Sequence, residues 1–313
     1  MNEIREQWLI LISTPIYLII IGVELLLSHL SSRKAYTLKD TLTNVYLMVA
    51  NSVIDVLFRV IYVAILAMVF KHAVYQWHNP ISYWLILLLA EDFLYYWLHR
   101  FDHEVRLFWA VHVTHHSSEQ LNFSVGFRSS VFQPLYRFIY FIPLAWLGFA
   151  PLDIVFMYSA TQIWGIFVHT EMINKMGWLE HVLVTPSHHR VHHASNAKYL
   201  DKNMGMFLIF WDKIFGTFQK ELAEEAYQPI RYGLTSNIKN KNAVNIIFHE
   251  WQQLWKDVLQ KNISFTQRMG YLFGPPGYSH DGSRMTSEEM RAAEDGETVI
   301  EKEVEPAKQP AFI

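Results

Sequence analysis

Three short segments of this chain carry histidines at helical spacing, the arrangement that metal binding by imidazole requires. Residues three and four positions apart lie on one face of an α-helix with Cβ atoms about 5–6 Å apart, so each segment can direct its rings toward a common centre. Several such helices brought together would form a metal site. The segments are "HRFDH" with His99 and His103, "HVTHH" with His112, His115 and His116, and "HHRVHH" with His189, His192 and His193.

The number of histidines predicts two metal ions. Nine of the sixteen histidines lie in these segments when His188 is counted, whereas a structural zinc site needs four ligands. The chain has no cysteine, which excludes thiolate ligands and a cysteine nucleophile. Imidazole suits zinc, copper, iron and nickel. A thiolate-free site of this size at a membrane surface favours two iron ions that activate O2, with zinc as the competing metal in purified material.

His188 is predicted to differ from its neighbours. It breaks the H-x-x-H-H repeat that the second and third segments share. It also lies one residue, or about 100° around a helix, from His189. We therefore expect His188 to support a ligand or to contact the substrate, and not to bind metal itself.

The elements that must position these histidines are predicted to be membrane helices. Hydrophobic residues make up 51% of the chain and charged residues 18%, and the apolar residues lie in blocks. About 20 apolar residues are needed to cross a bilayer, so the blocks predict an all-α, multi-pass fold of four to five spans. The blocks are 8–27, 45–70, 81–98 and 131–168, the last interrupted at "GFAP" as a hairpin.

The predicted topology places the histidine segments on one side of the membrane. The loop after the first block carries Arg33, Lys34 and Lys39, and such basic loops are typically cytoplasmic. Counting spans from that loop puts all three histidine segments and the C-terminus in the cytoplasm. The formal net charge of −3 gives no reason to expect nucleic acid as a partner.

The same patterns predict four regions. Residues 1–40 hold the N-terminal span and the basic loop, and residues 41–220 the catalytic domain. Residues 221–280 mix amphipathic pattern with turns, which predicts a cytosolic helical cap. From Asp281 to residue 313 the chain is acidic and poor in aromatic residues, which is typical of a disordered tail.

The three segments together resemble the membrane-bound fatty acid hydroxylase/sterol desaturase superfamily. The resemblance covers roughly residues 40–220 and includes "TPSHHRVHH" followed by "KNMGMFLIFWDKIFGTF". Glu104 directly after His103, and "PPGYSHDG" with the following "TSEE", are most similar to its alkylglycerol monooxygenase branch. The resemblance implies helices in the membrane, a cytosolic cap around a histidine-bound di-iron centre, and O2-dependent oxidation of a lipid C–H bond.

Position by position, the resemblance implies further site residues. The eight histidines of the three segments match the family's ligands, and His169 matches a lone histidine between the second and third segments. Asp92 lies on the same helix face as His99 but too far from it to bond that ring, so Asp92, if it belongs to the site, is expected to orient a histidine of another helix. Glu104 is expected either to do the same or to be a solvated charge, and Asn203 either to support the site or only to form a turn.

The resulting expectation is a di-iron monooxygenase that hydroxylates a lipid, with an alkylglycerol, a fatty acyl chain or a sterol-like molecule as substrate. The chain lacks a fused cytochrome b5-like haem domain, so electrons are expected from a separate partner or a pterin-like cofactor. Desaturation by the same site is the enzymatic alternative. Metal binding or transport without catalysis is the remote alternative, because a transporter would place ligands at mid-membrane depth.

Overall fold

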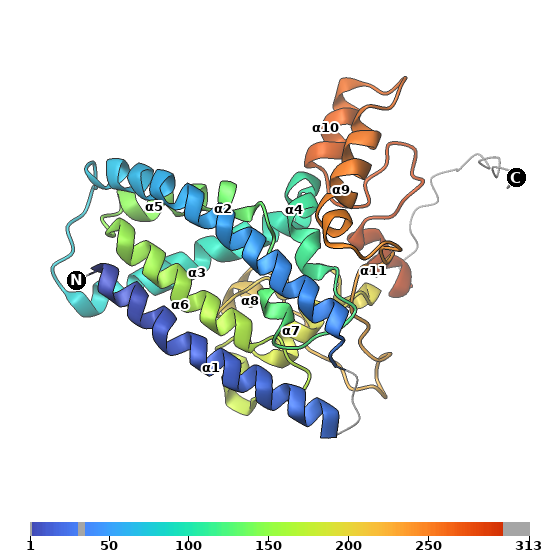
Figure 1. The fold of residues 1–313 in the computed structure, drawn as a ribbon. Helices are drawn as coiled ribbons and strands as arrows, with labels where there is room; N and C mark the ends of the chain where they lie inside the picture. The colour runs from blue at the N-terminus through green and yellow to red at the C-terminus, as the bar shows by residue number, and fades with distance from the viewer. Residues whose placement is uncertain (1, 31–34, 297–313) are drawn as a thin grey trace, which may run out of the picture.

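Long helices from the first third of the chain form the body of the structure (Figure 1). The computed structural model describes residues 2–30 and 35–296. The described part is helical apart from two isolated β-bridges, as the sequence predicts. The three longest helices are α1 (Asn2–Leu30), α2 (Leu38–Phe70) and α3 (Pro80–Glu104).

These three helices contain segments long and apolar enough to cross a membrane, which are Leu11–Leu30, Leu38–Phe70 and Pro80–Glu104. Large apolar side chains on α1 and α2 point away from the protein, including Ile19 and Val60. So large an apolar surface is unfavourable in water but favourable in contact with lipid. The chain is therefore an integral membrane protein.

The fourth apolar block forms a helical hairpin. It consists of α5 (Phe138–Trp146) and α6 (Pro151–Phe167), which pack against α2 and α3. Gly148 in the turn has φ of +90°, and a Cβ there would collide with the carbonyl oxygen of Tyr75, so glycine is required. The break at "GFAP" is confirmed. Both helices are shorter than a full span, and the number of four to five spans remains a prediction.

A partly buried ion pair stabilises the middle of α2. Arg59 Nη2 donates to Asp55 Oδ2 at 2.7 Å, as their spacing of four residues predicts. Arg137, just before α5, donates to the other carboxylate oxygen and lies over the ring of Tyr158. Charges inside a span are costly unless they are paired, so this network fixes α5 and α6 against α2.

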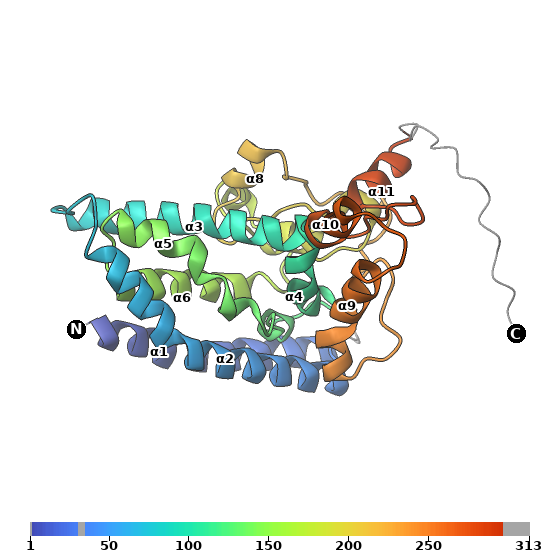
Figure 2. The same cartoon turned by 90° about the horizontal axis from the view of Figure 1, so that it is seen from above.

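Shorter elements gather at one end of the bundle, where the histidine segments lie. They are α4 (Arg106–His116), α7 (Pro186–His192), α8 (Phe210–Phe215), and the helices α9 (Ala243–Val258) and α10 (Phe265–Phe273). Figure 2 shows α4, α9 and α10 at the end opposite the α5–α6 turn. Ala110 of α4 packs against Leu254 and Val258 of α9, so the region after residue 220 covers the histidine-bearing helix.

The predicted disordered tail does not begin at Asp281. Residues Ser287–Glu294 form α11, which starts with a capping box between Thr286 and Glu289. Glu294 accepts hydrogen bonds from Tyr227, and Arg291 donates to the carbonyl of Leu200. Acidic composition suggested disorder, but caps and contacts with the rest of the fold hold this segment. Residues 297–313 lie outside the described residues.

Candidate metal centre

The structure brings all nine predicted histidine ligands together in two buried groups. In each group, one ring nitrogen per residue lies within 4.8 Å of the others. The five-histidine group is His99, His103, His112, His116 and His192, and the four-histidine group is His115, His169, His189 and His193.

Four elements supply these rings. The last turns of α3 carry His99 and His103, and α4, which follows a break at Val105, carries the second segment. Most of the third segment lies in α7. His169 follows the end of α6. Pro186 starts α7, and the side chain of Thr185 caps it, so the histidines after it are helical from the first turn.

Most of the rings are held through Nδ1 by an acceptor on their outer side. Such contacts fix the tautomer and the orientation of a ligand histidine. The acceptors are the carbonyl oxygens of Met204 for His99 (2.8 Å), Arg128 for His115 (2.9 Å), Gly165 for His169 (2.6 Å) and Lys202 for His192 (3.0 Å), and carboxylate oxygen of Asp201 for His103 (3.2 Å).

On the inner side of the four-histidine group, the Nε2 atoms of neighbouring rings face each other. Because His115 and His169 each donate Nδ1–H to a carbonyl, the Nε2 atom of each neutral ring can only accept. These two Nε2 atoms nevertheless lie 3.3 Å apart, and Nε2 of His189 lies 2.8 Å from that of His169. The lone pairs of His115 and His169 repel one another at this separation, and a shared cation would remove the repulsion.

The five-histidine group has unsatisfied nitrogens that fit a metal. Within the described part of the chain, Nε2 of His103, His116 and His192 is buried and has no hydrogen-bond partner. Buried polar atoms are nearly always paired, so three unpaired atoms converging on one point need an explanation. A metal ion bound by these nitrogens provides it.

Burial keeps the rings in the neutral form that binds metal. Desolvation lowers the pKa of His115 to about 4. It also lowers the pKa of His116 and His193 well below the usual value, with repulsion from neighbouring histidines as a further cause. At neutral pH these imidazoles therefore have free lone pairs.

His188 lies in α7 but belongs to neither group. Its Nδ1 accepts from the backbone N–H of Thr185 at 3.3 Å, which completes a capping box at the start of α7. Its ring packs edge-on against Phe218. His188 therefore stabilises the helix that carries His189 and His192 and that ends next to His193.

Asn203 both forms a turn and supports the site. Its φ of +57° is in the left-handed region, which asparagine tolerates better than most residues. Its amide donates to the carbonyls of His188 (3.0 Å) and Gln219 (2.8 Å). The side chain thus connects α7 to the segment after α8.

Asp92 does not orient a histidine, and Glu104 is the solvated charge that was one of its two expected roles. Asp92 contacts no histidine, because its carboxylate accepts from the N–H groups of Phe207 and Leu208 and from the indole of Trp211. Glu104 is paired with Arg100 at 2.8 Å, with its side chain 41% exposed. Asp92 faces the 207–211 loop, and Glu104 points outward from the end of α3.

Replacing Asp92 with alanine is expected to destabilise the protein by at least about 3 kcal/mol, because three buried donors lose a carboxylate acceptor. Thermal unfolding in detergent would measure this. Glu104→Ala is the matched control on the same helix and should change stability by less than about 0.5 kcal/mol, since exposed ion pairs contribute little. Equal effects of the two substitutions would contradict this account of α3.

Sequence reasoning missed three carboxylates around the histidines. Asp201 contacts His103, and Asp102 lies 3.6 Å from Nδ1 of His112. Asp212 accepts from the N–H groups of Met204 and Gly205 and so fixes the carbonyl that holds His99. Asp102 lies inside "HRFDH", which was a usable signal, whereas the other two become neighbours only through tertiary packing.

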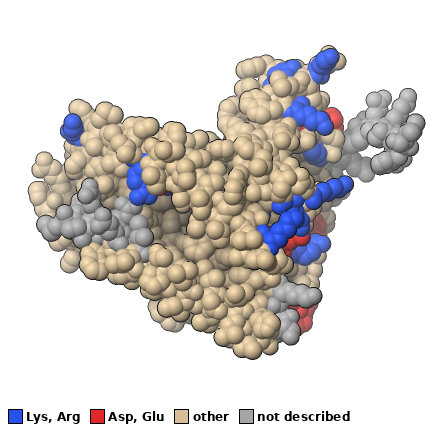
Figure 3. Space-filling view, viewed as in Figure 1, with Lys and Arg blue, Asp and Glu red and all other residues tan. Residues whose placement is uncertain are grey.

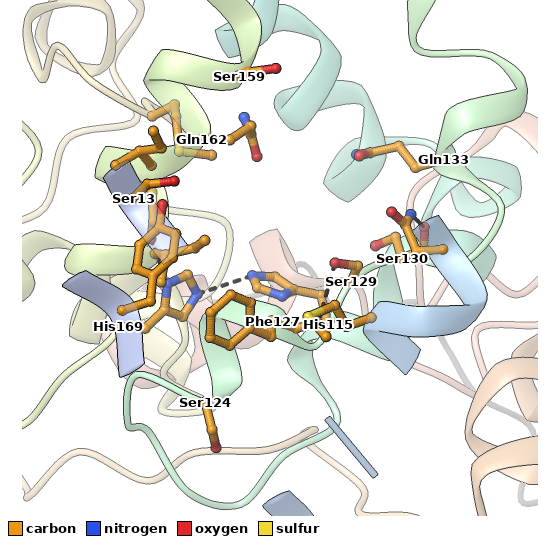
Figure 4. Close-up of a pocket in the computed structure, with 18 of the residues that line it drawn as sticks. Ser13, His115, Ser124, Phe127, Ser129, Ser130, Gln133, Ser159, Gln162 and His169 are labelled. Atoms are coloured by element: carbon orange, nitrogen blue, oxygen red, sulfur yellow. Dashed lines mark hydrogen bonds between the residues drawn. The ribbon is translucent and has the colours of Figure 1, made fainter. Parts of the chain in front are cut away.

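A cavity of about 730 Å³ reaches the histidines from the membrane helices, and we call it the membrane-side cavity. Apolar residues of α1 and α2 line much of it, among them Leu18, Ile21, Val45 and Met48. Figure 4 shows polar side chains around the space: Ser13, Ser159 and Gln162 face Ser130 and Gln133 across it, with His115 and His169 at one end.

A second cavity of about 420 Å³ reaches the histidines from the opposite side, and we call it the cap-side cavity. Its lining is more polar and includes Asp201, Glu250, Gln253 and Arg284. The two cavities share no histidine. His99, His112, His115, His169 and His189 line the membrane-side cavity, and His103, His116, His192 and His193 line the cap-side cavity.

Comparison with known proteins gives a consistent set of relatives. The family model described as fatty acid hydroxylase matches residues 84–217. The chain is 35% identical over 285 residues to the alkylglycerol monooxygenase of Homo sapiens, an alignment covering 89% of this chain and 62% of that protein. It is 32% identical over 146 residues to the ornithine lipid hydroxylase OlsE of Rhizobium tropici, covering 46% and 43%.

A relative named as an oxidase is also found. The lathosterol oxidase of Homo sapiens is 28% identical over 149 residues, covering 46% of this chain and 48% of that protein. The chain spans about three fifths or less of the length of the curated relatives it matches. No solved structure matches the chain.

Proposed function

Residues 84–217 are a fatty acid hydroxylase domain, and on that premise we propose that the chain is a di-iron monooxygenase that hydroxylates a C–H bond of a membrane lipid. Alkylglycerols are the first substrate class to test, because alkylglycerol monooxygenases match 87–89% of the chain in two alignments. Fatty acyl and sterol-like lipids are the next, given the other relatives.

One observation carries the proposal: an apolar cavity between membrane helices ends on histidines of both groups. His99 and His112 belong to the five-histidine group, and His115, His169 and His189 to the four-histidine group. A lipid chain in this cavity would therefore reach both ions without leaving the apolar interior. This arrangement also disfavours metal transport, since the histidines lie at the end of the bundle.

In this proposal the nine histidines hold two iron ions, which would supply the O2-dependent oxidation of a C–H bond. The protein's own contribution is binding and alignment. Carbonyl oxygens and Asp201 keep the rings oriented, and Leu18, Ile21 and Val45 exclude water from the cavity. Ser130, Gln133 and Gln162 provide polar contacts for the substrate's oxygen atoms.

Electrons would reach the histidines from the side opposite the membrane-side cavity. The cap-side cavity contacts three histidines of the five-histidine group, His103, His116 and His192, and its polar lining suits a water-soluble donor. We assign this route to the electron source, either a separate electron-transfer partner or a small pterin-like cofactor. Lipid and reductant would thus use different entrances.

The orientation that follows is cytoplasmic for the histidines and the C-terminus. Reporter domains fused after Lys39 and after Phe218 should both score cytoplasmic, because both positions lie at the end of the helical bundle that carries the histidines. A reporter fused after Gln76, in the loop between α2 and α3, should score on the opposite side. If the Lys39 and Phe218 fusions score on different sides, the orientation is wrong.

Lipid mass spectrometry tests the reaction. Membranes from cells that express the chain would be compared with membranes from cells that express His192→Ala. Gain of one oxygen in an alkylglycerol, acyl or sterol species only with the intact chain is the expected result. Loss of two hydrogens would favour a desaturase instead. Identical lipid profiles, with both proteins folded and the intact chain loaded with iron and supplied with reductant, would overturn the proposal.

A further inference from the structure

Helix α9 carries an exposed apolar stripe that is separate from the face it buries. Ile246, Ile247, Leu254 and Val258 are buried against the protein. The stripe consists of Val244, Phe248, Trp255 and Leu259 at its end, which are 40–70% exposed. At 100° per residue these four side chains fall within about 60° of one another around the helix.

The start of α9 packs against α2 well inside the apolar helix. Ile246 and Ile247 form one cluster with Leu47 of α2, and Ala50 and Ile54 pack against that cluster. With 33 residues, α2 exceeds the roughly 20 needed to cross a bilayer by about 13 residues. The position of this excess decides where the membrane surface lies relative to α9.

Polar contacts place the excess at the N-terminal end of α2. Asp40 is paired with Arg128 at 3.1 Å, and Asn44 donates to Ser124 at 3.0 Å and accepts from Arg128 at 2.7 Å. Such a network does not face lipid. If the first 13 or so residues of α2 project from the hydrocarbon, the membrane boundary passes near residue 51, beside the start of α9.

The orientation and charge of α9 suit a membrane surface. Figures 1 and 2 both show α9 crossing α2 at a steep angle, so α9 runs along the membrane rather than through it. Its two acidic residues, Glu250 and Asp257, point inward and pair with Arg106, which leaves Lys256 exposed. Figure 3 shows mostly basic side chains around α9 and α10.

We propose that α9 is an interfacial helix whose stripe of Val244, Phe248, Trp255 and Leu259 inserts among the lipids of the same bilayer that α2 spans. A tryptophan in the apolar stripe and a lysine beside it are typical of helices that lie at the membrane surface. Because α9 packs on α4, this contact also fixes the depth at which α4 presents His112, His115 and His116.

Spin labelling tests the proposal directly, since the chain has no cysteine of its own. Phe248→Cys and Leu259→Cys would place a nitroxide in the stripe. Gln253→Cys is the matched control, because Gln253 is exposed on the other side of α9, at the cap-side cavity. The full chain would be reconstituted in nanodiscs of phosphatidylcholine and phosphatidylglycerol. Bound metal equal to that of the parent chain would show that each variant is folded.

We expect the labels at 248 and 259 to collide several-fold more with O2, which partitions into lipid, than with a water-soluble nickel chelate. The label at 253 should show the reverse. Equal access of the nickel chelate to all three sites would overturn the proposal. So would shielding of the stripe labels from both reagents together with spin–spin coupling between chains, which would show a second copy on this surface. Neither result depends on catalytic activity.

Discussion

Replacing His189 with alanine is expected to lower the bound metal from two ions to about one per chain, and to reduce lipid hydroxylation by at least about 100-fold. Nε2 of His189 lies 2.8 Å from that of His169 and 3.1 Å from that of His193, so its loss removes one nitrogen from a group of four. Altering even the partners of ligand residues costs about 10- to 100-fold, and loss of a ligand should cost more. Plasma mass spectrometry of freshly purified protein measures the metal.

His188→Ala is the matched control, because His188 is the adjacent residue of α7 and is equally buried. Its loss removes a helix-capping contact, for which we expect a cost in stability of about 1 kcal/mol. Both metal ions should remain. His72, which is exposed, should be replaceable by alanine without effect on either property. If His188→Ala loses as much metal as His189→Ala, the two histidine groups do not describe the ligands.

Replacing Ser159 with tryptophan is expected to reduce hydroxylation by about 100-fold while both metal ions stay bound. Ser159 lies on α6 and points into the membrane-side cavity (Figure 4), so an indole there would occupy space that the lipid needs. A displacement of about 1 Å in a bound substrate can cost 100-fold in rate. Turnover of an alkylglycerol in proteoliposomes, with metal content determined on the same sample, measures both quantities.

Ser159→Ala should retain most of the activity, because it adds no volume. A fully active Ser159→Trp variant would show that the lipid does not use this cavity. Loss of metal in the tryptophan variant, but not in the alanine variant, would show that the bulky side chain disturbs the histidines. In that case the loss of activity could not be assigned to the substrate.

The sequence by itself determined that a histidine cluster would form and that the fold would be helical. Eight histidines could be selected from the sixteen in the chain because ligand spacing on a helix is a local property, set by 3.6 residues per turn, and the ninth, His169, was implied by the family resemblance. The three long apolar segments were equally readable, since crossing a bilayer requires about 20 consecutive apolar residues whatever the rest of the fold does. The hairpin break at Gly148 followed from local turn chemistry.

Only the tertiary structure decided how the nine histidines divide. His115 and His116 are adjacent in the sequence but lie in different groups, and so do His192 and His193. Neighbouring residues point about 100° apart on a helix, so a single segment can serve two centres. Which ring faces which centre depends on how α3, α4 and α7 pack, and no local pattern records that.

The partners of the buried carboxylates could not be predicted from local sequence either. Asp92 was expected beside a histidine, yet its carboxylate binds residues 207–211, more than 100 positions away in the chain. Asp201 reaches His103 across a similar separation. A carboxylate accepts hydrogen bonds from any donor that packing brings within about 3 Å. Its residue type therefore predicts that it will be paired when buried, and only the fold determines its partner.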